Sequence, residues 1–156
     1  MKKYISVFLC LFWMGLIFYN SSQSGSESNY RSFSMVNNIT QSKNTTKSTQ
    51  AILPQNKKDN KVNLILRKNA HGFEYLILTI ILSITFNVFG KDIKKNVINI
   101  LFVALLYSVT DEFHQIFVRG RTSSVQDILI DFIGALIGIL MVFVFNNIRE
   151  KTIKNY

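Results

Sequence analysis

The chain has 156 residues, of which 48% are hydrophobic, and its formal net charge is +9 at pH 7. This length fits a single domain, and the lone cysteine, Cys10, excludes a disulfide within the chain. A strongly basic protein can bind nucleic acid. Here, however, the lysines flank hydrophobic runs, which favours anchoring at an anionic membrane surface instead.

The hydrophobic residues gather in four runs, which predict an all-α integral membrane bundle of four transmembrane helices. We expect these helices at residues 4–20, 73–89, 97–117 and 125–145. At about 1.5 Å of rise per residue, each run together with its flanks can cross a hydrocarbon core of about 30 Å. A soluble bundle would need polar helix faces, which the second and fourth runs lack.

The first run could also be the hydrophobic part of a secretory signal peptide, because Lys2 and Lys3 precede it. The small-residue cleavage motif nearby, at residues 22–24, matches poorly. Trp13 suits a retained helix, as an interface or packing aromatic. We therefore expect this helix to remain in the protein.

A long polar loop is expected between the first two helices, at residues 21–63. Of the 44 residues from 20 to 63, 25 are Ser, Thr, Asn or Gln. Such a segment can bury little apolar surface and is expected to be mobile. With this loop included, residues 1–156 form one membrane domain.

The distribution of Lys and Arg favours a cytoplasmic position for both termini. Lys2, Lys3, the turn at 90–96 and the tail after 145 carry closely spaced cations near helix ends. The other side spreads its cations over longer segments, and density near helix ends sets orientation. The basic group at 57–68 argues for the reverse orientation.

Successive membrane-spanning helices run in opposite directions, so most of the acidic residues are expected at one face of the bilayer. Five of the nine acids lie at that face, and ionisable groups within a membrane cost several kcal/mol unless they are paired or hydrated. This face is therefore the candidate functional site. The predicted site residues are His71, Glu74, Asp111, Glu112, His114, Gln115, Arg121, Asp127 and Asp131, supported by Ser21, Ser22, Gln23, Lys68, Tyr75 and Gly134.

Helical spacing places several of these residues on common faces. His71 precedes Glu74 by three positions and Asp127 precedes Asp131 by four, so each pair shares a helix face. The stripe of the second pair continues through glycines, where another helix can approach closely. Arg121 is the expected cation, because its planar guanidinium can bridge two carboxylates or hold an anionic ligand.

The residues leave three functions open for this site. It could bind a lipid-linked or envelope molecule, it could be a membrane-embedded hydrolase or transferase with or without a metal ion, or it could be a structural network without catalysis. The candidate metal ligands are His71, Glu74, Glu112 and His114, although their spacing matches no firm metal motif. No cofactor is identified from the sequence.

Three blocks of the sequence resemble the VanZ-like family of bacterial membrane proteins. Residues 13–24 resemble its opening helix, which ends in Ser-Ser-Gln, and residues 68–75 resemble its Lys-x-x-His-x-x-Glu-Tyr block. Residues 107–138 carry the strongest block, with Asp-Glu-Phe-His-Gln-Ile-Phe, a Gly-Arg pair and two later aspartates. Arg119 departs from the family, which usually has proline before the Gly-Arg pair.

The resemblance implies a multi-pass protein of the bacterial cytoplasmic membrane with a role in the cell envelope. The namesake of the family is associated with low-level resistance to teicoplanin, a lipid-bearing glycopeptide antibiotic. The expected partners are therefore membrane lipids and a lipid-linked envelope precursor or glycopeptide. The resemblance implies no defined reaction.

Overall fold

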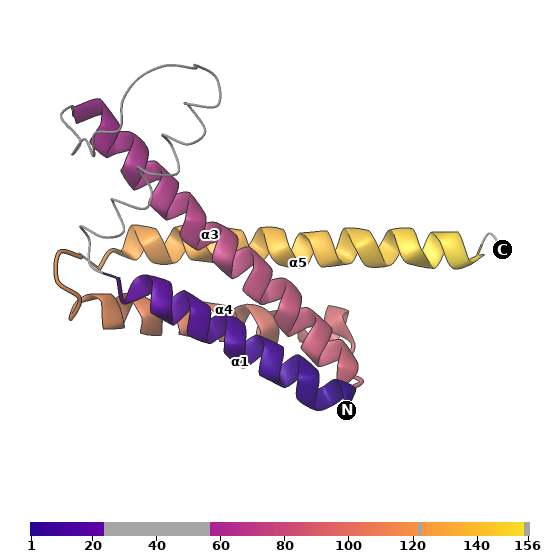
Figure 1. Cartoon of the computed structure of the whole chain (residues 1–156). Helices are drawn as coiled ribbons and strands as arrows, with labels where there is room; N and C mark the ends of the chain where they lie inside the picture. Colours follow the sequence, from indigo (N-terminus) through magenta and orange to yellow (C-terminus); the bar gives the residue numbers. More distant parts are fainter. Residues whose placement is uncertain (24–56, 122, 155–156) are drawn as a thin grey trace, which may run out of the picture.

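A computed structural model describes residues 1–23, 57–121 and 123–154 (Figure 1). Within these ranges the protein is all-helical and has no strand. Most of the stretch that the sequence predicts to be a polar loop, residues 24–56, lies outside the described residues. The helices are labelled as in Figure 1: α1 (Lys2–Ser21), α3 (Lys57–Val88), α4 (Ile93–Gln115) and α5 (Val125–Lys154).

All four helices are long and apolar enough to cross a membrane, judged by length and composition. The membrane-length stretches are Lys2–Ser21, Lys68–Val88, Ile93–Gln115 and Val125–Thr152. The four-helix architecture predicted from the hydrophobic runs is thereby confirmed.

All four helices begin at or before the start of the predicted hydrophobic runs, whereas α3 ends at Val88 and α4 at Gln115, just inside the runs 73–89 and 97–117. α3 begins at Lys57, inside the stretch expected to be loop, and α5 continues to Lys154. α4 begins at Ile93 and not at residue 97, because the Asp92 side chain accepts a 2.9 Å hydrogen bond from the backbone N–H of Lys94 and caps the helix. A hydrophobic run marks the membrane core, whereas a helix continues into polar flanks where its backbone bonds remain favourable.

The bundle is organised around α3, which packs against each of the other three helices and most extensively against α5. The α3–α5 crossing is close because glycines face it. A Cβ added at Gly134 would overlap the backbone carbonyl of Gly72, and one at Gly138 would overlap the carbonyl of Leu76. The glycine stripe on α5 therefore meets α3, as close backbone approach requires.

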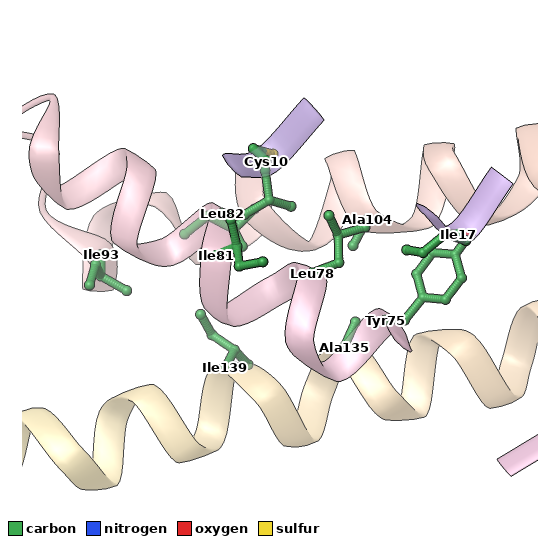
Figure 2. Close-up of a cluster of buried hydrophobic side chains, with 11 residues drawn as sticks. Cys10, Ile17, Tyr75, Leu78, Ile81, Leu82, Ile93, Ala104, Ala135 and Ile139 are labelled. Atoms are coloured by element: carbon green, nitrogen blue, oxygen red, sulfur yellow. The ribbon is translucent and has the colours of Figure 1, made fainter. Parts of the chain in front are cut away.

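The apolar core lies along α3, where side chains from all four helices meet. Figure 2 shows Ile17 of α1 beside Tyr75 of α3, and Ile139 of α5 below Leu82. The outer surface is apolar as well, with exposed side chains such as Phe102. A buried polar set beneath an apolar surface is the arrangement expected of helices surrounded by lipid.

Candidate functional site

The predicted site residues gather at one end of the bundle. The end of α1, the end of α4 and the start of α5 lie together at the left of Figure 1, and α3 crosses α5 next to this end. Several side chains there are almost fully buried although they are polar, including Asp111 and Asp131 at 2% exposed each, Glu112 and Gln115 at 3%, and Ser21 at 0%. These buried polar side chains come from α1, α4 and α5.

The end of α1 is bound to the end of α4 through a carboxylate. The Ser21 hydroxyl donates to Asp111 Oδ2 at 2.6 Å, and the Gln115 side-chain amide donates to the same oxygen at 3.1 Å. Asp111 and Gln115 are one helical turn apart, so a single face of α4 provides both groups. Ser21 is the one serine of the Ser-Ser-Gln motif whose side chain enters the site. Ser22 is exposed, and its hydroxyl bonds to the Phe18 carbonyl of its own helix.

Glu74 joins α3 to α1. Its Oε2 lies 3.3 Å from His71 Nδ1, and its Oε1 accepts a 2.7 Å hydrogen bond from the Asn20 amide. Its main-chain oxygen accepts a 3.0 Å hydrogen bond from Trp13 Nε1. Asn20 is not among the site residues predicted from the sequence, and the sequence indicates only a packing or interface role for Trp13. The position of Asn20 directly before the Ser-Ser-Gln motif was the available signal.

Arg121 connects the contacts around Asp111 to those around Glu74. Its Nε and Nη2 donate to the main-chain oxygens of Gln23 and Asn20 at 2.9 and 3.0 Å. Its Nη1 donates to Gln115 Oε1 at 3.2 Å and lies 3.4 Å from His71 Nε2. The partners in these contacts are carbonyl oxygens and an imidazole. A role of Arg121 in bridging carboxylates or holding an anionic ligand stays a prediction. The carbonyls at the end of a helix lack helical partners, and Arg121 supplies donors for them.

Two acidic residues join α4 to the start of α5. The Ser108 hydroxyl donates to Asp131 Oδ2 at 2.7 Å, and the backbone N–H of Ser124 donates to Glu112 Oε2 at 3.0 Å. Ser108 was absent from the predicted site, although it lies three residues before Asp111 and so shares its face. We call these polar residues together the polar network. It comprises Asn20, Ser21, His71, Glu74, Ser108, Asp111, Glu112, Gln115, Arg121 and Asp131.

A small cavity adjoins this network between α3, α4 and α5. Its volume is about 10 Å³, which is space for about one water molecule. Lys68 Nζ lies 2.7 Å from Asp127 Oδ1 at the cavity wall. The residues that line the cavity are Lys68, His71, Gln115, Asp127, Ile130 and Asp131.

The four candidate metal ligands do not come together. His71 and Glu74 form a pair, but Glu112 is bound by the Ser124 N–H, and the His114 ring packs against Phe18 with 4.2 Å between ring centroids. Among the described residues, no three His, Cys, Asp or Glu side chains are placed to hold a metal ion. His114 therefore packs on an aromatic neighbour and does not join the His71–Glu74 pair.

The chain matches the family model of VanZ/LLP1 over residues 6–146. That range contains every residue of the polar network. No match to the chain was found among curated proteins or solved structures. Because the matched region spans nearly the whole sequence and all four membrane-length helices, the chain belongs to the VanZ/LLP1 family and is a multi-pass membrane protein.

Proposed function

We propose that this protein acts in the bacterial cell envelope, where its polar network binds the polar head of a lipid-linked envelope molecule. The observation that carries the proposal is burial: Ser21, Asp111 and Asp131 come from three helices and are each at most 2% exposed. Polar groups at such positions cost free energy unless they are matched. These groups are matched to one another by hydrogen bonds, and ionisable residues inside membrane-spanning helices mark functional sites more often than packing positions.

The contacts of His71 and the serines favour binding over hydrolysis. When Nδ1–H of His71 donates to Glu74, Nε2 accepts from Arg121, so both ring nitrogens are engaged. The hydroxyls of Ser21 and Ser108 donate to carboxylates and not to a histidine base. The base most often paired with a serine nucleophile is a histidine, and neither of these hydroxyls donates to one.

The proposal is tested in a bacterium that lacks its own copy of the gene and expresses this chain. Two readouts are measured: teicoplanin susceptibility, and the lipid-linked envelope molecules that co-purify with the protein, identified by mass spectrometry. Asp131→Asn is compared with Glu150→Gln, because Glu150 is exposed near the far end of α5. Wild type and Glu150→Gln should reduce susceptibility several-fold and retain lipid-linked material, and Asp131→Asn should lose both effects.

The same experiment separates the other two functions. A structural network predicts that Asp131→Asn lowers the yield of folded protein, which size-exclusion chromatography measures. An enzyme predicts chemically altered lipids in cells with the wild-type protein and no stoichiometric retention. Unchanged susceptibility together with no retained lipid-linked molecule in any folded variant would reject the proposal.

A further inference from the structure

A groove of about 920 Å³ lies beside the start of α1, at the end of the bundle opposite the polar network. The helix α1 connects the two ends, because Lys2 begins it, Ser21 ends it within the network, and its 20 residues rise about 30 Å. Figure 1 shows the start of α1 next to the end of α3, at the lower right. Pockets that bind ligands commonly have volumes of about 300–1,000 Å³, so the groove is large enough for part of a bound molecule.

The walls of the groove are apolar side chains from two segments. Val7, Phe8 and Leu11 come from α1, and Val88 and Phe89 come from the end of α3 and the residue after it. The large side chains among them, Phe8, Leu11 and Phe89, are exposed and are not covered by another helix. Walls of this kind match a hydrocarbon chain, which can pack along them through dispersion contacts.

Helix geometry explains why this apolar face of α1 stays open. Ser6 and Cys10 are buried, and the Ser6 carbonyl accepts a 3.3 Å hydrogen bond from Thr85 Oγ1 of α3. Val7 and Leu11 each come one position later, which is about 100° further round the helix. The small residues therefore pack α1 against α3, and the neighbouring apolar stripe lines the groove.

Two lysines stand at the mouth of the groove. Lys2 and Lys3 both line it, and both are exposed. Lys3 Nζ lies 5.4 Å from the centroid of the Phe89 ring, which is within the range of a cation–π contact. Within the described part of the chain, no ion pair involves either lysine. Their charge therefore remains available to an anionic partner.

The turn that follows Phe89 keeps this end of the bundle basic. It carries Lys91 and, at the start of α4, Lys94 and Lys95, against a single acid, Asp92. The Asp92 carboxylate already accepts a hydrogen bond from the backbone N–H of Lys94. The charge near the groove is therefore complementary to an anion.

The position of the lysines identifies the kind of anion. α1 has the length and composition of a membrane span, and Lys2 and Lys3 lie at its start, where lipid head groups are expected. A phosphate at that level can accept hydrogen bonds from both ammonium groups. An acyl chain of the same molecule can then extend along the apolar wall for about two helical turns, or roughly 10 Å.

We propose that the groove binds one anionic phospholipid, whose phosphate lies at Lys2 and Lys3. One of its acyl chains lies along Val7, Phe8 and Leu11. This site is separate from the polar network and belongs to the opposite leaflet, so it goes beyond the proposed function and does not depend on it.

Native mass spectrometry of the purified full chain, released from detergent micelles, tests the proposal. Titration with phosphatidylglycerol and with phosphatidylcholine of identical acyl chains gives the apparent Kd of the first bound lipid. Phosphatidylglycerol should bind about tenfold more tightly or better, because lysines near a membrane surface attract anionic lipid. Glycerol 3-phosphate, which has a phosphate but no acyl chain, should not bind at the same concentrations.

Two double variants locate the head group. Lys2→Gln/Lys3→Gln should lose most of the preference for phosphatidylglycerol. Lys94→Gln/Lys95→Gln is the matched control, since it removes the same charge from exposed residues at the same end of the bundle that do not line the groove. This control should keep the preference of the wild type.

Two tryptophan variants locate the acyl chain. Val7→Trp fills the groove and keeps both lysines, so phosphatidylglycerol should bind about tenfold more weakly, as expected when a bulky side chain takes the place of the ligand. Leu9→Trp should bind as the wild type does, because Leu9 is exposed on α1 but does not line the groove. Lysines also direct membrane insertion, so Val7→Trp keeps the test decisive if Lys2→Gln/Lys3→Gln inserts poorly.

Four results would overturn the proposal. The first is equal affinity for the two phospholipids, and the second is an equal loss in the two lysine variants, which would indicate general attraction to a basic surface. The third is unchanged affinity in Val7→Trp. The fourth is a dimer in lipid-free detergent that dissociates in Val7→Trp, which would show that a second copy of the chain occupies the groove.

Discussion

Ser21 and Asp111, 90 positions apart in the sequence, are joined by a buried 2.6 Å hydrogen bond between the serine hydroxyl and Oδ2 of the carboxylate. This bond fixes the end of α1 against the last turns of α4. It also explains why a small hydroxyl residue stands at the end of an apolar helix. A larger apolar side chain would leave the Asp111 carboxylate without that donor.

We predict that Ser21→Ala destabilises the protein by roughly 1–3 kcal/mol, because it removes a donor from a buried carboxylate. Chemical or thermal unfolding in detergent micelles measures the loss. The matched control is Ser22→Ala, whose hydroxyl is exposed and bonded within its own helix. That variant should unfold within about 0.5 kcal/mol of wild type. Equal losses for the two variants would show that the Ser21–Asp111 bond contributes nothing specific.

We predict that Gly134→Ala separates α3 from α5, because the added Cβ would overlap the carbonyl of Gly72. Overpacking of this kind costs about 1–3 kcal/mol or more. The control is Gly15→Ala, since a Cβ at Gly15 of α1 would meet nothing within 4 Å. Alanine there should stabilise the helix by up to about 1 kcal/mol. Both effects are measured as shifts of the unfolding midpoint, and a Gly134→Ala midpoint at or above wild type would contradict the close crossing.

The stripe of glycines on α5 shows what the sequence could and could not predict. Gly134 lies about one helical turn from both Asp131 and Gly138, and such a stripe indicates a face where another helix comes close. It does not indicate which helix, because all the neighbours are equally apolar. The structure shows that α3 is the partner, through Gly72. The number of spanning helices and the face that collects the acids followed from composition and alternation.

The contacts within the site were harder to predict, because their partners carry weak sequence signals. Ser108 and Asn20 are single short polar residues inside or beside apolar runs. The side chains of such residues often hydrogen-bond only to the backbone of their own helix. Arg121 binds main-chain oxygens of Asn20 and Gln23. Any residue type has such an oxygen, so only the three-dimensional position of the end of α1 identifies these acceptors.

We predict that Arg121→Lys weakens the attachment of the end of α1 to the rest of the bundle. A lysine ammonium is a compact group and cannot span the oxygens of Asn20, Gln23 and Gln115 that the guanidinium reaches together. The loss should be at least about 2 kcal/mol, since hydrogen bonds to charged groups contribute roughly 1.5–3 kcal/mol each. Hydrogen–deuterium exchange of the peptide covering residues 13–23 should become faster.

Arg119→Lys is the control for this prediction, because Arg119 lies two residues away and is exposed. Its exchange should match that of wild type. Unchanged exchange in Arg121→Lys, or equal acceleration in both variants, would show that the guanidinium does not hold α1 in place.

We predict that both termini face the cytoplasm and that the polar network lies toward the outer side of the membrane. Lys94 follows the α3–α4 turn at one end of the bundle, and Ser123 lies in the α4–α5 connection at the other end; both are exposed. In a Cys10→Ala background, a membrane-impermeant thiol reagent applied to intact cells should label Ser123→Cys and spare Lys94→Cys. Permeabilised cells should show labelling of both, which confirms that each thiol is reactive.

The reverse labelling pattern would overturn this orientation and would also weaken the envelope proposal. A cell-wall antibiotic that arrives from outside can reach the network only if the α4–α5 connection faces outward. The cation density near the helix ends favours that arrangement, because Lys2, Lys3, Lys91, Lys94 and Lys95 would then lie at the cytoplasmic surface. Orientation and function are therefore linked, and one labelling experiment bears on both.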